Sequence, residues 1–230
     1  MRITAENINW RVAAGELLLI VVGILLALAI DSWAEQRKEI AQADVYLKDM
    51  AIELRAELEH LDINRKQLTR LKVSATALLQ TLQSSELSAD DPGGLLISSV
   101  IGEGIVRESA IWQEIQMTGA LRLIRDPALR SAIVSHYLTL AVGYQIIDAN
   151  FMPAVRDVRA LAWDVMPVDS IGRYMRTKQT GVPPEVVMQK LRARNDSAYL
   201  LKRLIATSTV AGINIDAASK STRALLDRLE

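Results

Sequence analysis

The chain has 230 residues, no cysteine, and equal numbers of basic and acidic side chains, 27 of each. The lack of cysteine excludes disulfides, thiolate zinc sites and iron–sulfur clusters. A net charge of zero argues against a nucleic-acid partner, because such proteins usually carry a basic excess. The apolar residues are mainly Leu, Ala, Ile and Val, and only 4% of all residues in the chain are aromatic. This composition favours long helices and predicts an all-α fold.

Residues 12–30 form an apolar run interrupted only by Glu16. Its 19 residues approach the ~20 that a helix needs to cross ~30 Å of hydrocarbon. Trp10 and Trp33 lie on either side of the run and are expected to anchor it at the two membrane interfaces. The sequence therefore predicts a short tail over 1–11, a transmembrane helix over 12–33, and a water-soluble helical bundle over 34–230.

A cleaved signal peptide is an alternative interpretation of the same segment. Arg2 and Arg11 would form its charged region, and Ala27-Leu28-Ala29 offers a cleavage site with small residues. The orientation of an uncleaved span is also open, because Lys and Arg residues are nearly balanced on its two sides. Two arginines and the free amine before the span slightly favour a cytoplasmic N-terminus. We therefore expect a periplasmic soluble domain.

Small residues recur on one face of the predicted span. Gly23 and Ala27 form a small-x-x-x-small pair that allows two helices to approach closely, and Gly15 lies on the same face. Glu16 would either hydrogen-bond across such a contact or reach water at the interface. Glycine and alanine are common in membrane helices, so a face without any packing role is equally compatible with the pattern.

Beyond the span, apolar residues over 34–84 recur in steps of three and four, with a drift to Leu71 and Leu78. No Pro or Gly occurs between Gly23 and Pro92, so the transmembrane helix is expected to continue into this segment. Further along we expect a loop over 84–94, a short apolar helical turn over 95–101, and a helix over 107–116 that ends at Thr118-Gly119.

Asp126 and Pro127 are typical of the N-cap and first position of the next helix, which extends towards Val165. Pro153 should kink or split it near Asn150. Residues 166–182 are expected to be a connection, and a last helix begins near Pro183, with Gly212 as a potential break. No segment shows the alternating polarity of a strand. The predicted fold is thus an elongated antiparallel bundle of about four long helices.

Two segments resemble a family of uncharacterised bacterial single-pass membrane proteins. The first matches its Gly-Glu pair, Gly-Ile-Leu core and Trp-x-Glu tail at Gly15, Glu16, Gly23, Ile24, Leu25, Trp33, Glu35 and Arg37, although Asp31, Ser32 and Ala34 replace the family's asparagines. The second matches more loosely, at the turn from Gly119 to Asp126 and at Leu129, Arg130 and Tyr137. The resemblance implies bacterial origin and a single span, and it implies no activity.

Candidate chemistry is sparse. His60 and His136 fall on different predicted helices, and neither has a companion at metal-ligand spacing. Asp49, Glu53 and Glu57 recur every four residues, which suits a solvated, salt-bridged face better than carboxylate chemistry. A site joining His136 and Tyr137 to Glu114 depends on how the helices pack. We expect no enzymatic activity, metal or cofactor.

The turn between Gly119 and Pro127 is the best candidate recognition site. Arg122, Arg125 and Arg130 concentrate positive charge there, close to the start of a helix. An anion or an acidic partner would suit that charge, whereas capping and surface salt bridges would explain the same residues without a ligand.

These observations favour a structural or interaction protein of the bacterial inner membrane. Its expected partners are the lipid bilayer and either a second copy of the chain or another membrane protein, with no nucleic acid. The alternative is an extracytoplasmic helical domain that senses or binds a ligand and signals through a partner. A polar pocket between the helices would support that alternative.

Overall fold

The computed structural model describes residues 10–84, 89–101 and 109–230. Within these ranges the protein is entirely helical and contains no strand, which confirms the all-α prediction. The elements are α1 (Trp10–Gln83), α2 (Pro92–Ser98), α3 (Ala110–Thr118), the 3₁₀ turn η1 (Ala120–Leu123), α4 (Pro127–Ile146), the π-helical turn η2 (Ile147–Phe151), α5 (Met152–Val165), α6 (Val168–Thr177), α7 (Pro184–Ala193) and α8 (Ser197–Leu229).

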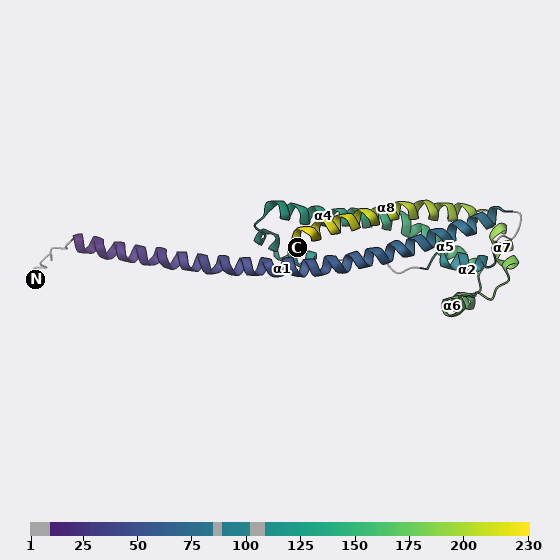
Figure 1. Ribbon diagram of the computed structural model, residues 1–230, viewed down its shortest axis with the longest axis horizontal. Coiled ribbons are helices and arrows are strands. Elements are labelled where there is room, and N and C mark those ends of the chain that lie inside the picture. Colours follow the sequence, from purple (N-terminus) through teal and green to yellow (C-terminus); the bar gives the residue numbers. More distant parts are fainter. Residues whose placement is uncertain (1–9, 85–88, 102–108) are drawn as a thin grey trace, which may run out of the picture.

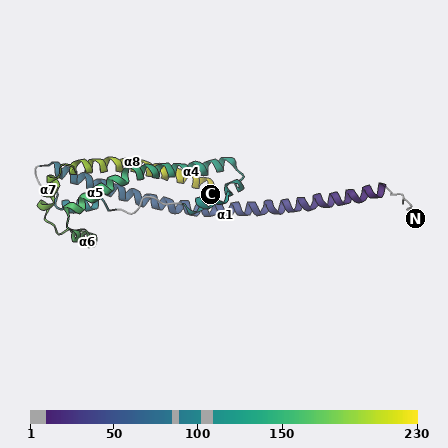
Figure 2. The same cartoon turned by 180° about the vertical axis from the view of Figure 1, so that it is seen from behind.

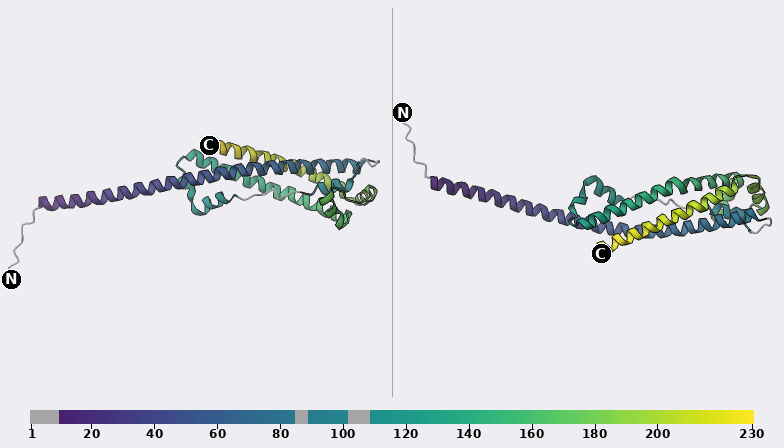
Figure 3. Two further views of the ribbon diagram at one scale, coloured as in Figure 1. Left: turned by 60° about the horizontal axis from the view of Figure 1, so that its bottom comes forward. Right: turned by 90° about the horizontal axis from the view of Figure 1, so that it is seen from above.

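The helix α1 forms a rod whose first half projects alone and whose second half is covered by the rest of the chain (Figures 1 and 2). Along that second half lie α8 and the continuous rod made by α4, η2 and α5, with α8 running opposite to both (Figures 1 and 3). The described domain thus has three long helical segments where the sequence predicted about four, because α3, α6 and α7 remain short.

The predicted continuity of α1 is confirmed, since it runs for 74 residues without a break. Every residue from 14 to 42 is exposed, whereas from Ala43 onward one residue in three or four is buried. Leu71 and Leu78 are both buried, as the predicted drift of the apolar pattern requires. The buried line, here called the α1 seam, consists of Ala43, Tyr46, Met50, Leu54, Glu57, Leu61, Asn64, Leu68, Leu71, Ala75 and Leu78.

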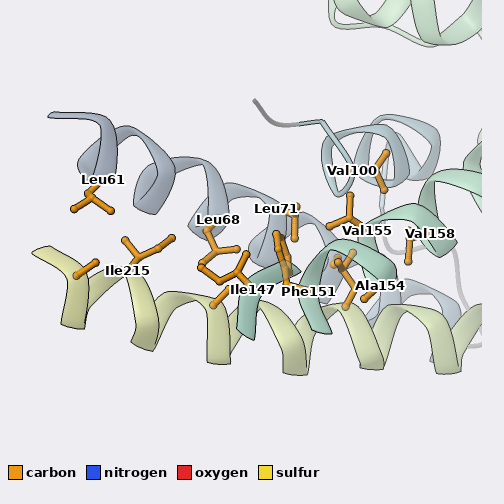
Figure 4. Packing of buried hydrophobic residues seen from close by; sticks show 14 of the residues in the cluster. Leu61, Leu68, Leu71, Val100, Ile147, Phe151, Ala154, Val155, Val158 and Ile215 are labelled. Carbon is orange, nitrogen blue, oxygen red and sulfur yellow. The ribbon is translucent and has the colours of Figure 1, made fainter. Parts of the chain in front are cut away.

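The helix pair α4–α5 begins where the sequence predicted and is distorted close to the predicted position. Asp126 accepts a hydrogen bond from the backbone N–H of Ala128 at 2.8 Å, and Pro127 is the first residue of α4. Pro153 lacks an N–H, and the ladder widens into η2 just before it instead of breaking. The two ends of η2, Ile147 and Phe151, are buried and face the α1 seam (Figure 4).

Two predicted connections contain more structure than expected. The expected loop over 84–94 is shortened because Asp91 caps α2, its Oδ1 accepting the N–H of Gly94 at 2.8 Å; residues 85–88 of that loop lie outside the described ranges. The expected connection over 166–182 contains α6. The helix expected from 107 is described from Ala110, and residues 102–108 also lie outside the described ranges.

The predicted break at Gly212 is wrong, because α8 runs through it. A Cβ at Gly212 would lie 3.6 Å from Leu68 Cδ2, so this position is where α8 packs against α1. The last helical region instead breaks between α7 and α8. There Arg194 donates two hydrogen bonds to the Asp196 carboxylate and one to Asp164 Oδ2 at 2.6 Å, which links the break to α5. The Arg194 guanidinium holds the pKa of Asp196 below its usual range.

Candidate functional site

The four predicted packing residues of the span all face outward. A Cβ added at Gly15 or Gly23 would meet nothing within 4 Å, and Glu16 and Ala27 are exposed. One helix among the described residues is long and apolar enough to cross a membrane, and none of its most apolar 18-residue window is buried. The face is therefore open along α1, with no other described element of the chain against it (Figure 1).

The two predicted interface anchors differ in what the structure describes. Trp33 is exposed, and the guanidinium carbon of Arg37 lies 5.1 Å from the centroid of its ring. Trp10 is the first residue of α1, but its side chain lies outside the described part of the chain, as do residues 1–9 of the predicted tail.

The candidate recognition turn is shaped mainly by its own capping. Gly119 adopts a left-handed φ of 67° and closes α3, which confirms the predicted C-cap. Arg130 donates to the backbone oxygens of Ile124 at 2.6 Å and Arg125 at 3.3 Å, so its charge holds the turn together. Arg122 instead lines a hollow against α1 that Glu35 and Glu39 also line. Arg122 and Arg130 thus have different surroundings, and Arg130 is engaged by the backbone of its own turn.

A different site emerges from the packing: a cavity of about 350 Å³ between α1, α3 and α4. Its wall on α1 is acidic, and its wall on α3 and α4 is largely aromatic. The lining consists of Glu53, Glu57, Ser109, Trp112, Gln113, Gln116, Tyr137, Leu140, Ala141 and Tyr144.

The aromatic wall is rigidly built. The rings of Trp112 and Tyr137 stack with centroids 4.4 Å apart and planes at 8°. Ser109 accepts the backbone N–H of Trp112 at 3.0 Å as the N-cap of α3, and its hydroxyl donates to the Tyr137 hydroxyl oxygen at 3.3 Å. One serine thus fixes both the start of α3 and the position of the tyrosine. A preformed apolar surface of this kind suits ligand binding.

The acidic wall consists of two carboxylates with different roles. Glu53 Oε2 accepts the backbone N–H of Ile111 at 3.1 Å, so it joins α1 to the first turn of α3. Glu57 is buried in the α1 seam, and its Oε2 lies 3.6 Å from Nε2 of His136. His136 is itself buried and its Nδ1 lies 3.1 Å from the hydroxyl of Ser221 on α8. Glu57 and His136 therefore connect the cavity to the core.

Burial of Tyr137 raises the pKa of its phenol from 10.0 to about 12, and the negative charges of Glu53 and Glu57 add to the rise while the Ser109 hydrogen bond opposes it. The negative potential of Glu53 and Glu57, which disfavours the phenolate, would favour a positive group in this cavity, whereas burial opposes any charge.

The sequence analysis named several of these residues but paired His136 with the wrong glutamate. Glu114 does not meet His136; it accepts a hydrogen bond from the Tyr46 hydroxyl at 3.1 Å, and Glu57 is the acidic neighbour of the histidine. The sequence pattern predicts Glu57 on a solvated, salt-bridged face, whereas the structure buries it. Its spacing of three from Leu54 and four from Leu61 was the available signal, because that spacing places a carboxylate on the buried seam.

Among the residues that the structure describes, no three His, Asp or Glu side chains come together as a metal site. Comparisons with protein-family models, curated proteins and solved structures find no match to this chain. The functional argument therefore depends on the chain's own residues and their geometry.

Proposed function

We propose that this chain is a membrane-anchored helical interaction protein of the bacterial inner membrane, with its folded domain on the periplasmic side. The observation that supports this most is the first half of α1. Its leucine, isoleucine and valine side chains between Leu17 and Ile30 are 47% to 74% exposed. An apolar surface this continuous is unstable in water, whereas a bilayer would cover it.

An uncleaved anchor is proposed over a signal peptide. The Ala27-Leu28-Ala29 segment lies within α1, which continues for more than fifty residues and supplies the seam on which the domain is built. Removing the segment up to Ala29 would leave that seam intact. The seam therefore does not distinguish a retained span from a cleaved one. The support for retention is Trp33, which lies beyond the cleavage site and contacts Arg37. An aromatic residue at this place would anchor a retained span at the membrane interface.

Self-association or docking on another membrane helix is the proposed use of the span. The face containing Gly15, Gly23 and Ala27 has no covering element in the described chain and would allow close helix contact. On the domain, Val134, Leu138 and Val142 form an exposed apolar line on α4, from 41% to 62% exposed. Isolated exposed apolar residues are ordinary, but a line at four-residue spacing is typical of a helix that meets a partner.

Cysteine labelling tests the membrane arrangement, because the native chain has no cysteine. A single cysteine replacing exposed Gln179 should react with a membrane-impermeant maleimide once the outer envelope is permeabilised. A cysteine replacing Asn7 should react only after the inner membrane is opened. The mass of the membrane-bound protein should be that of the full chain. A mass lacking the segment up to Ala29, or the reverse labelling pattern, would contradict the proposal.

Ligand binding by the domain is the second candidate function. The observation favouring it is the cavity between α1, α3 and α4, whose wall on α1 belongs to the helix that continues towards the span. A ligand that ordered this cavity would act directly on the helix that leads to the membrane and to any partner helix there.

A further inference from the structure

The cavity lined by Glu57, Trp112 and Tyr137 carries an inference about what it binds. We propose that it holds a small organic cation, with the positive group at the Glu57 carboxylate and the apolar body against the stacked rings of Trp112 and Tyr137. The inference depends on the ligand-binding function given above as the second candidate, and it is independent of how the span is used.

The size and surface of the cavity suit a small molecule. A volume of about 350 Å³ lies near the lower end of the range for ligand pockets, which is roughly 300–1,000 Å³. The lining combines a stacked aromatic pair and Leu140 with a few polar groups on one side. Such a surface binds an apolar body by contact, and the polar groups set its orientation.

The charge of the cavity selects a cation. Glu53 and Glu57 are its ionisable acids, and the described lining contains no lysine or arginine. The Glu57 side chain is only 10% exposed, so its charge is poorly screened by water. An anion placed here would meet two carboxylates, and a cation would be attracted both by them and by the electron-rich faces of the rings.

His136, the existing neighbour of Glu57, is too far away to form a hydrogen bond with Oε2 of its carboxylate. The Glu57 Oε2 is 3.6 Å from His136 Nε2, which is longer than a hydrogen bond. A ligand ammonium or guanidinium N–H would approach a carboxylate oxygen to roughly 2.7–2.9 Å. Glu53 is already engaged by the N–H of Ile111, so Glu57 is the main anchor and Glu53 contributes charge at longer range.

The source of the cation is the surrounding solution rather than a lipid headgroup. Glu57 follows Trp33 by 24 residues of continuous helix. At ~1.5 Å per residue this places it roughly 36 Å beyond the predicted membrane interface. Headgroups of a bilayer that surrounds the span do not reach that far, so a dissolved amine or quaternary ammonium compound is the expected ligand class.

The test uses the full chain in detergent micelles and benzyltrimethylammonium as the probe, with binding measured by calorimetry. Benzyl alcohol is the neutral comparison and benzoate the anionic one. We expect the cation to bind at least tenfold more tightly than either. Glu57→Gln should weaken the cation at least tenfold, and Trp112→Leu should weaken it while leaving the preference for positive charge. Glu59→Gln, on the exposed face of the same helix, should change nothing.

Equal binding of benzyl alcohol and the cation, no heat from the cation at millimolar concentration, or an unchanged affinity in Glu57→Gln would each overturn the proposal. Circular dichroism and thermal unfolding of each variant show whether the domain is folded. If Glu57→Gln does not fold, the affinity of Trp112→Leu for the cation is the deciding measurement. Membrane retention of the same samples is measured separately. Loss of cation binding in a retained protein rejects this site alone, and loss of retention with intact binding rejects only the proposed anchor.

Discussion

The two halves of α1 have the same secondary structure and opposite surroundings. Leu19, in the first half, is 74% exposed, whereas Leu54, in the second, is completely buried. No glycine, proline or cap separates them, and the helix passes from one to the other over a few residues after Gln42. In the first half apolar residues surround the helix, and in the second they form the α1 seam with polar residues opposite.

This difference shows that helix formation and burial are specified separately. A helix that is apolar all round needs an apolar medium, whereas a helix with one apolar line needs partner helices. The second half of α1 packs mainly against α8, with α2 and α3 and side chains of η2 such as Phe151 also against it, and the first half has no partner within the described chain (Figures 1 and 4). One continuous helix can therefore connect a folded core to a medium that the chain does not provide.

The largest expected effect comes from deleting a side chain of the seam. Leu54→Ala should lower the free energy of unfolding of the domain by about 2–5 kcal/mol, because it leaves a cavity in a fully buried position. Leu25→Ala, in the first half, should leave that free energy unchanged. Urea unfolding in detergent, followed by circular dichroism, measures both. Equal effects would mean that the two halves of the helix do not differ as described.

Alkaline unfolding tests the burial of Tyr137, which lines the cavity beside the second half of α1. The Tyr137 pKa is about 12 when folded and near 10.0 when unfolded, so the unfolded chain loses its proton first as the pH rises. The stability from this group should therefore be full below about pH 10 and fall by roughly 2–3 kcal/mol as the pH rises to about 12. Tyr137→Phe should lack this part of the decline. Parallel declines in both proteins would show that Tyr137 is not buried as described.

A bulky residue on the open face of the span should weaken helix association. Gly23→Leu should weaken self-association, because it separates the two backbones at the small-residue pair. Ala29→Leu makes a similar small-to-large change on another face of the helix and should have little effect. Crosslinking or dilution-dependent energy transfer in membranes measures the association. A wild-type monomer at all protein-to-lipid ratios would end the self-association proposal.

The smallest expected effect lies at the end of the domain farthest from the first half of α1 (Figure 1). Arg194→Ala removes the link from the α7–α8 break to Asp164 and Asp196, and it should lower the midpoint of thermal unfolding only slightly, since these groups are largely solvated. Lys66→Ala, which removes a pair within one turn of α1, should lower it less. Thermal unfolding of both variants is measured at low and at high salt. The loss of stability in Arg194→Ala should become smaller as the salt concentration rises. A salt-independent loss would indicate a packing role instead.

The features predicted correctly from the sequence are those that neighbouring residues determine. The continuity of α1 follows from the absence of Pro and Gly, Gly119 from the need for a left-handed residue, and the distortion at η2 from the missing N–H of Pro153. Each of these outcomes is decided within about one helical turn.

The features that sequence reasoning missed depend on distant residues. Glu57 is buried because His136, far along the chain on α4, lies beside it, and Gly212 stays helical because Leu68 packs against α8 at that point. The last break occurs instead at Arg194, where Asp164 of α5 supplies a hydrogen-bonding partner. The spacing of Glu57 along α1 indicated that it is buried, but no local pattern specifies its contact with His136 or the cavity that forms where α1, α3 and α4 meet.

Membrane retention of matched charge variants tests the central claim most directly. Ile24→Lys with Leu28→Lys places two charges on the first half of α1, and Ile52→Lys with Ile63→Lys places two at similarly exposed apolar positions on the second half. Each charge should cost about 2.5–3.5 kcal/mol within the hydrocarbon and almost nothing in water. We predict that the first pair releases the protein from membranes under alkaline extraction and that the second does not. Equal retention of both pairs would contradict a membrane-spanning first half.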